Sequence, residues 1–381
     1  MLLSLAALHA FAQTDTATNT PPKTSGLRIS LLTCGTGYEQ VYEIFGHTAL
    51  RVVDSNEHGP LGDLVYNYGM FGYDEQFEMK FMRGKLLYYV ATNLFGDFMQ
   101  EYMHYGRSVE EQVLMIDDAT KAEINNFLKK NVEPENRYYK YDFFFDNCAT
   151  RLRDVFPRAL GRDFVYGESR PMGVALTFRD IINQYFYARH WERVGVNILL
   201  GSRIDKVMTN EDIMFLPDYL RDGVAGAKLR GQQFATRAKV LLPGGEKPPA
   251  GTNWALVLTG AILALTIAGH AVKRLALLGR IMRFLVLFVT GLLGCIICVM
   301  WFGTDHQGCS NNFNLLWAVP LNLFIAFANP KGKGKYAMIG ALMVLVSVVL
   351  HVVHIQGLVP ELFLLLLSLL IVYGSIYRRH A

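Results

Sequence analysis

The stretch FLVLFVTGLLGCIICVMWF, residues 284–302, contains no charged side chain and is long enough to cross a hydrocarbon layer of about 30 Å as a helix. Four further apolar runs approach this length: NWALVLTGAILALTIAGHAV (253–272), FNLLWAVPLNLFIAFA (313–328), YAMIGALMVLVSVVLHVVH (336–354) and ELFLLLLSLLIVYG (361–374). Together the five runs predict an all-α bundle of five transmembrane helices over residues 253–381. Pro320 lies inside the third run, which a packed membrane helix tolerates better than an isolated one.

Basic residues predict the orientation of this bundle, because lysine and arginine are retained on the cytoplasmic side of a membrane. They fall in alternate connections and after the last run, at Lys273, Arg274, Arg280, Arg283, Lys331, Lys333, Lys335, Arg378 and Arg379. The connections at 303–312 and 355–360 contain none. We therefore expect a multi-pass protein of the inner (cytoplasmic) membrane, with a cytoplasmic C-terminus and with the residues before 253 in the periplasm.

The start of the chain is consistent with export. Residues 1–12 contain an apolar run that ends in Ala-Phe-Ala, which predicts a cleaved signal peptide although a basic n-region is missing; a buried N-terminal helix is the alternative. The polar, Pro- and Thr-rich residues 13–27 are predicted to be a disordered lead-in. Residues 28–237 are long enough for one sizeable core, and residues 238–252 form a Pro/Gly-rich linker to the membrane.

Charge gives no indication of a nucleic-acid partner. The formal net charge is +4, but residues 252–381 hold nine basic and two acidic side chains, whereas the rest of the chain holds 28 basic and 31 acidic ones. The excess of positive charge therefore comes from the predicted cytoplasmic connections, where it serves orientation. We expect no nucleic acid among the partners.

The part before the membrane mixes strand and helix patterns. Alternation and composition predict strands in LRISLLTCG (27–35), HTALRVVD (47–54), DLVYNYGMF (63–71) and SVEEQVLMID (108–117). Helical spacing appears in TKAEINNFLKKNV (120–132) and CATRLRDVFPRAL (148–160). This mixture indicates an α+β domain.

Cys34 and Cys148 are the only cysteines of this domain, and in an oxidising periplasm two thiols form a disulfide readily. Cys148, however, follows Asp146 and Asn147, which are both favourable N-cap residues. We therefore expect Cys148 in the first turn of a helix, where the helix dipole lowers the pKa of a thiol, with Asp146 opposing that effect slightly. Such a thiol is a candidate nucleophile.

A thiol nucleophile needs a base, and His47, His58, His104 and His190 are the candidates in the domain. His58 lies in a predicted turn, and the other two follow aromatic segments that are typical of packing or surface positions. His47 opens a predicted strand directly after Gly46. If residues 47–54 and 63–69 form a hairpin, Asn67 lies opposite or diagonal to His47, within reach of an amide side chain, and orients the imidazole as in a Cys-His-Asn set.

The order of a strand histidine, a polar partner on the next strand and a later Asn-Cys pair that opens a helix resembles the circularly permuted NlpC/P60 papain-like enzymes. A closer resemblance is to the Lnb-type lipoprotein N-acyltransferases. The segments that carry it are TCGTGYEQVYEIFGHTALRVVD (33–54), DLVYNYGMF (63–71), KFMRGKLLYYV (80–90), YYKYDFFFDNCATRLRD (138–154), TDH (304–306) and NLLWAVPLNL (314–323). The resemblance covers nearly all of the chain after the predicted signal peptide.

This resemblance implies a papain-like periplasmic domain and acyl transfer through a thioester, from a phospholipid donor to the α-amine of a diacylated lipoprotein. Cys148 and His47 would be the catalytic pair, without a metal or any other cofactor. Asn67 would be the third member, although Tyr68 or Glu39 is an alternative orienting residue, and Asn147 would support the helix start.

Two residues of the outer connection, Asp305 and His306, belong to the TDH segment, and we expect them to help position the lipid headgroup or the substrate amine. The alternative function is a membrane-tethered cell-wall amidase or endopeptidase of NlpC/P60 type, which would use the same residues but would need only one span. A membrane scaffold with a degenerate papain-like domain is a third possibility. It predicts that Cys148 is dispensable.

Overall fold

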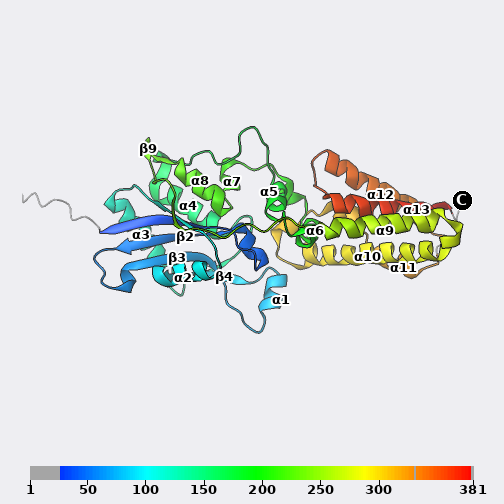
Figure 1. The fold of residues 1–381 in the computed structure, drawn as a ribbon, viewed down its shortest axis with the longest axis horizontal. Coiled ribbons are helices and arrows are strands. Elements are labelled where there is room, and N and C mark those ends of the chain that lie inside the picture. Colours follow the sequence, from blue (N-terminus) through cyan, green and yellow to red (C-terminus); the bar gives the residue numbers. More distant parts are fainter. Residues whose placement is uncertain (1–25, 330–331, 379–381) are drawn as a thin grey trace, which may run out of the picture.

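The computed structural model describes residues 26–329 and 332–378. It contains an α+β domain followed by a helical bundle, and the two lie end to end along the long axis of the molecule (Figure 1). This arrangement confirms the predicted fold class. The predicted signal peptide, 1–12, and most of the predicted lead-in, 13–27, lie outside the described residues.

The α+β domain is built on a seven-stranded antiparallel sheet of order β10-β5-β1-β2-β3-β4-β6. Its strands are β1 (Leu27–Cys34), β2 (His47–Asp54), β3 (Asp63–Met70), β4 (Leu87–Leu94), β5 (Val109–Val113), β6 (Tyr138–Lys140) and β10 (Lys239–Leu242). A second, small sheet contains β7 (Phe164–Val165), β8 (Lys228–Leu229) and β9 (Gln232–Gln233). Strand β10 lies inside the expected linker, so the domain extends beyond residue 237, and β1 begins at the last residue of the expected lead-in.

Helices cover both faces of the sheet, which explains why β1 is buried along most of its length. One face packs on α3 (Asp118–Asn131), α4 (Cys148–Leu160) and α8 (Pro217–Ala225), and the other on α2 (Phe95–His104). The remaining helices of the domain are α1 (Phe77–Met82), α5 (Phe178–Tyr185), α6 (His190–Leu199) and α7 (Asn210–Ile213), with 3₁₀ turns η1 (Val41–Phe45), η2 (Pro60–Gly62), η3 (Gly161–Asp163) and η4 (Ser202–Asp205). The four predicted strands and two predicted helices are all present.

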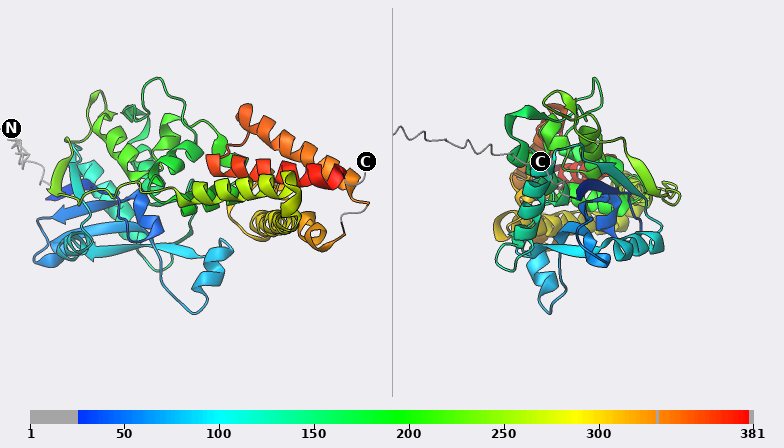
Figure 2. Two further views of the ribbon diagram at one scale, coloured as in Figure 1. Left: turned by 45° about the vertical axis from the view of Figure 1, so that its right-hand side comes forward. Right: turned by 90° about the vertical axis from the view of Figure 1, so that its left-hand side faces the viewer.

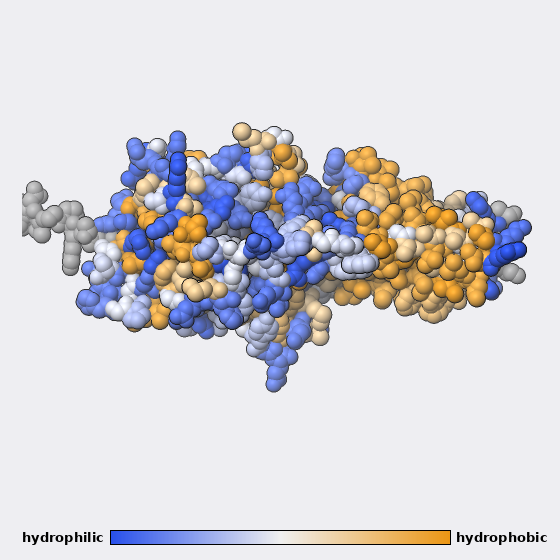
Figure 3. Space-filling model, in the orientation of Figure 1, coloured by the Kyte–Doolittle hydropathy of each residue, from blue (hydrophilic) through white to orange (hydrophobic). Residues whose placement is uncertain are grey.

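The bundle contains α9 (Trp254–Ala271), α10 (Ala276–Gly303), α11 (Leu321–Phe327), α12 (Gly334–Val352) and α13 (Pro360–Arg378), with short 3₁₀ turns η5 (Lys273–Leu275), η6 (Gln307–Cys309) and η7 (Phe313–Leu316). Within the described residues, α9, α10, α12 and α13 are long and apolar enough to span a membrane, and α11 is too short. The flank of the bundle is hydrophobic, and its end far from the α+β domain is hydrophilic (Figure 3). That hydrophilic end is where the predicted cytoplasmic connection η5 lies.

The third predicted span is not a continuous helix. The chain from 313 to 328 passes through η7, an irregular stretch and the short α11, whose N-cap is Pro320. It packs against two glycines of α10, because a Cβ at Gly291 or Gly294 would lie about 2 Å from the backbone of Leu323 or Ala318. Irregular backbone is tolerated at this depth because it is enclosed by protein, so the third apolar run forms two short helical segments and an irregular stretch between them.

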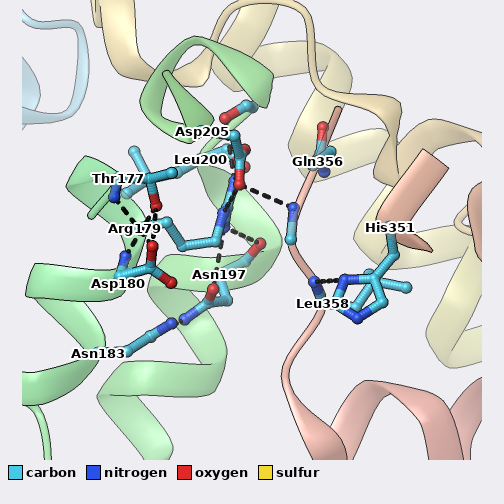
Figure 4. Close-up of polar contacts among 12 residues, drawn as sticks. Thr177, Arg179, Asp180, Asn183, Asn197, Leu200, Asp205, His351, Gln356 and Leu358 are labelled. Carbon is cyan, nitrogen blue, oxygen red and sulfur yellow. Dashed lines mark hydrogen bonds and ion pairs between the residues drawn. The ribbon is translucent and has the colours of Figure 1, made fainter. Parts of the chain in front are cut away.

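The two parts are joined by buried polar contacts around Arg179 (Figure 4). The Arg179 guanidinium donates to both carboxylate oxygens of Asp205, at 2.8 and 3.0 Å, and to the side-chain oxygen of Asn197 at 2.9 Å. Asp205 also accepts the N–H of Gly357, at 2.8 Å, from the connection between α12 and α13. Helix α6 adds apolar contact, since Ile198 belongs to the hydrophobic core of the bundle. These contacts fasten α5, α6 and η4 of the α+β domain to the bundle.

Candidate active site

The candidate nucleophile, Cys148, is the first residue of α4, as predicted. Asn147 is the N-cap: its side-chain oxygen accepts the Thr150 N–H at 2.9 Å, and the Asn147 N–H donates to the Thr150 hydroxyl at 2.8 Å. The side-chain amide of Asn147 donates to the carbonyls of Phe143 and Phe215, both at 2.8 Å. Asn147 thus uses both ends of its side chain to hold the start of α4, which makes it a support residue.

The Cys148 thiol lies where strands β2 and β3 separate. The β2–β3 ladder ends at the pair Ala49 and Asn67. The N–H of Thr48, beyond this pair, has no partner in β3 and donates to the Cys148 sulfur. Gly69 of β3 has a φ of +86°, and a Cβ there would lie 3.7 Å from the Cys148 Cβ. Glycine accepts this backbone conformation at little cost, and it lets the helix start approach the end of β3.

Burial raises the pKa of the Cys148 thiol to about 11, because it disfavours the thiolate. The N–H groups of Thr48, Ala149 and Cys148 itself lower the pKa, but by less than burial raises it. Asp146, which we expected to oppose the helix dipole, is paired with Arg151 through contacts of 2.5 and 2.7 Å. The prediction of a lowered pKa is wrong for this state. The thiol is neutral at pH 7 and needs a base.

His47 is the first residue of β2 and is held by Asn67. Because Ala49 is the ladder partner of Asn67, His47 is its diagonal neighbour, as predicted. The His47 Nε2 lies 3.1 Å from the Asn67 Oδ1. An amide oxygen only accepts hydrogen bonds, so Nε2 carries the proton and Nδ1 keeps a free lone pair. The basic nitrogen of His47 is therefore Nδ1.

Asn93 of β4 extends this contact across a third strand. The Asn67 Nδ2 donates to the Asn93 Oδ1 at 2.8 Å, which orients the Asn67 amide with its oxygen toward His47. Asn67 is only 3% exposed. Sequence reasoning missed Asn93, because residues 71–86 separate β3 from β4. The signal for it in the sequence was an amide side chain near the end of the largely apolar and aromatic strand LYYVATNL.

The two alternative orienting residues do not bond the imidazole. Tyr68 points to the opposite face of the sheet, into the core beneath α4, and its buried hydroxyl has no hydrogen-bond partner among the described residues. Glu39 is exposed in the connection between β1 and η1, where its backbone carbonyl accepts from Arg189. Of the three candidates, the structure brings Asn67 to His47.

Burial also lowers the pKa of His47, to about 4. The hydrogen bond to Asn67 raises this pKa and the cation of Arg107 lowers it, but both effects are smaller than that of burial. The imidazole is therefore neutral at pH 7 and able to accept a proton. Within the described chain no hydrogen bond joins His47 to Cys148. Thr48, the neighbour of His47, is the residue that contacts the sulfur.

The other thiol of the domain, Cys34, is the ladder partner of His47, and the three other histidines bond neither Cys148 nor His47 in the described chain. Cys34 is a free thiol, as Cys148 is, and it is buried with Leu32 and Phe98 on the α2 side of the sheet, so the disulfide alternative is not formed. His58 is exposed in the turn between β2 and β3. His104 ends α2, and the His190 ring bonds the Ala250 carbonyl at 3.0 Å.

Asp305 and His306 are placed at the junction of the two parts and have no bond to Cys148 or His47. The Asp305 carboxylate accepts from Lys140 of β6 at 2.7 Å, and its N–H donates to the Arg83 carbonyl at 2.9 Å. The His306 Nε2 lies 3.0 Å from the Phe81 carbonyl. Both residues therefore hold the segment around α1 against the outer end of α10.

Two family models match the chain. The Lnb N-terminal periplasmic domain matches residues 14–188, which include Cys148, His47 and Asn67, and the Lnb transmembrane domain matches residues 248–380. The chain belongs to the Lnb family. No curated protein and no solved structure shows significant similarity to it.

Membership of the Lnb family confirms the resemblance drawn from the sequence. This Lnb protein is a multi-pass membrane protein with a periplasmic domain, and it is a lipoprotein-modifying acyltransferase. The α+β domain is thus the periplasmic part, and the end of the bundle that contacts it is the outer end. Residues 248–253 lie in the transmembrane family model although helix α9 begins only at Trp254.

Proposed function

We propose that the protein moves an acyl chain from a phospholipid to the α-amine of the N-terminal cysteine of diacylated lipoproteins, through a thioester on Cys148. Family membership supports lipoprotein N-acylation. The observation that supports the mechanism is the position of His47, which directly precedes the residue whose N–H contacts the Cys148 sulfur. A helix-start thiol contacts the Thr48 N–H, and the imidazole of the preceding residue, His47, is held by Asn67 with Nδ1 free.

In the first half-reaction the His47 Nδ1 takes the proton of the Cys148 thiol as the sulfur attacks the ester carbonyl of the phospholipid. The sulfur–carbon bond forms, the ester carbon–oxygen bond breaks, and the proton passes to the leaving alcohol, which departs as a lysophospholipid. The N–H groups of Thr48 and of Cys148 are suitable donors to the oxyanion that develops on the carbonyl. For this step the imidazole must reach the thiol, so the proposal requires His47 to move into contact with Cys148.

In the second half-reaction the lipoprotein amine attacks the thioester. The nitrogen–carbon bond forms, the sulfur–carbon bond breaks, and the amine proton returns through His47 to the Cys148 sulfur. Water must be kept out until the amine arrives, which favours a site close to the bilayer surface. Strand β1 runs toward the bundle, so Cys34 and its ladder partner His47 lie at the end of the sheet that faces the membrane (Figure 1).

The N-terminal mass of a lipoprotein tests this function directly. In cells that lack other N-acyltransferases, we expect the N-terminal peptide of a diacylated lipoprotein to gain the mass of one acyl chain when the protein is expressed, together with a lysophospholipid product. Release of cell-wall peptide fragments without that mass shift would support the tethered amidase or endopeptidase instead.

Asn67→Ala tests how the imidazole is held. Without the amide oxygen the Nε2–H tautomer of His47 loses its partner, and we expect kcat/KM for acyl transfer to fall about 10- to 100-fold. A protein whose activity stays within about twofold of the unsubstituted protein would contradict this role. Tyr68→Phe is the matched control, since it removes an unpartnered hydroxyl from the adjacent position on the other face and should leave activity unchanged.

A further inference from the structure

The segment between β3 and β4, residues 71–86, is here called the α1 hairpin. Its helix α1 has no buried residue. Four large side chains of the hairpin are exposed, at 74% for Tyr73, 48% for Met79, 52% for Phe81 and 54% for Met82, whereas Phe71 and Phe77 are half-buried. The hairpin also holds three exposed carboxylates, at Asp74, Glu75 and Glu78. Such a grouping of exposed apolar side chains on a water-facing domain marks a contact with another surface.

The α1 hairpin lies beside the outer end of the membrane bundle (Figures 1 and 2). Its carbonyls at Phe81 and Arg83 accept from His306 and Asp305, immediately after the end of α10. In the last two turns of α10, Val299 and Phe302 are 61% and 71% exposed. The exposed apolar side chains of the hairpin therefore lie next to the apolar, lipid-facing surface of the bundle, whereas the tip of the hairpin is hydrophilic (Figure 3).

Aromatic rings connect the hairpin to the catalytic cysteine. A Cβ at Gly69 would lie 3.7 Å from both the Cys148 Cβ and the Tyr141 ring, so these two groups flank the same point. From Tyr141 the contacts pass to Tyr88, at 4.1 Å between ring centroids, and from Tyr88 to Phe71, at 5.3 Å. The row then continues into α1 through Phe77, at 5.7 Å from Phe71, and Phe81, at 6.1 Å from Phe77.

We propose that the α1 hairpin inserts its exposed apolar side chains into the outer leaflet of the membrane, and that the aromatic row leads one acyl chain of a phospholipid from the leaflet to Cys148. We infer that the molecule bound along the aromatic row is a phospholipid, because the hairpin lies next to a lipid-facing surface and because the row consists of aromatic rings. Arg83 and Lys85 are exposed at the base of the hairpin, where a cation meets lipid phosphates. The acyl path rests on the proposed function, whereas the membrane contact does not.

Photocrosslinking of the full-length protein tests the contact. p-Benzoylphenylalanine at Met79 or Met82, in vesicles of phosphatidylethanolamine and phosphatidylglycerol, should give a phospholipid adduct in at least about tenfold higher yield than at Leu61. Leu61 is 68% exposed but lies in η2, at the end of the sheet remote from the bundle. Equal yields at the three positions would overturn the membrane contact. At Phe71, absence of an adduct would overturn the acyl path.

Activity gives a second measurement. Met79→Asp combined with Met82→Asp should slow transfer from a bilayer phospholipid at least about tenfold, because a charged pair opposes insertion. The same variant should use a detergent-dispersed short-chain phospholipid at an unchanged rate, and Leu61→Asp should be unaffected with both donors. Equal slowing with both donors would contradict the proposal, since it would indicate damage to the catalytic site.

The membrane contact of the hairpin and the proposed function can be tested separately, because formation of the phospholipid adduct does not require acyl transfer. Cys148→Ser should retain the Met82 adduct in full. If Cys148→Ser abolishes transfer but no adduct forms at Met79 or Met82, the hairpin inference is wrong and the proposed function stands. If the adduct forms while Cys148→Ser still transfers acyl chains, the membrane contact stands and the thioester mechanism is wrong.

Discussion

Cys148→Ser should abolish lipoprotein N-acylation, with a fall in the rate of at least about 1000-fold, because a hydroxyl at this position is a far weaker nucleophile than a thiol that gives up its proton to His47. The hydroxyl is close in size to the thiol, and Asn147 holds the helix start independently of it. The folded protein should therefore still be inserted and the loss should be chemical. Mass spectrometry of a lipoprotein N-terminus measures the result.

Cys34→Ala is the matched control for this substitution. Cys34 is also a free, buried thiol at the end of a central strand, and it is the ladder partner of His47, but it lies in the core on the α2 side of the sheet. Its removal should leave the transfer rate within about twofold, since alanine fills most of the space of a buried thiol. Transfer that survives Cys148→Ser, or that is lost equally in Cys34→Ala, would refute Cys148 as the nucleophile.

His47→Ala should lower kcat/KM by about 100- to 10 000-fold, the range expected when a general base is removed. The pH profile makes the test specific. The measurement uses the first half-reaction, followed as release of lysophospholipid, because the lipoprotein amine has an ordinary pKa of about 8 and its protonation gives overall transfer an acid limb of its own. The base must be neutral, and the pKa of His47 is about 4, so lysophospholipid release should persist as the pH falls through 6.5 and should decline only near pH 4. On the alkaline side the rate should decline only near pH 11, because the pKa of the Cys148 thiol is about 11. An acid limb close to 6.5 would contradict the buried, neutral imidazole.

His58→Ala is the corresponding control, since His58 is exposed in the turn between β2 and β3, at the opposite end of the strand that His47 begins. It should leave both the rate and the pH profile unchanged. A similar fall in kcat/KM for the two variants would show that loss of an imidazole, irrespective of its place, disturbs the protein.

Much of the site was predictable because its contacts are local. Asn147 and Cys148 are adjacent to a helix pattern, so capping chemistry predicted the helix start. His47 and Asn67 lie on two strands joined by one turn, and the two-residue period of strands placed them as diagonal neighbours. Contacts between distant segments were not predictable. Asn93 joins the site only through the β3–β4 pairing, and β10 reaches the sheet from beyond the expected domain end.

By itself the sequence determined the α+β domain, the apolar spans and their orientation, the helix start at Cys148 and the contact between His47 and Asn67. These features depend on periodicity, hydropathy and short-range geometry, which a chain expresses locally. Only the tertiary structure decided the ionisation of the thiol, the broken third span and the place of the α1 hairpin. Burial outweighs the helix dipole at Cys148, glycines of α10 enclose the irregular backbone near Pro320, and Asp305 and His306 bind the hairpin against the bundle. Each of these outcomes depends on contacts between segments that are far apart in the sequence, and local sequence patterns do not specify such contacts.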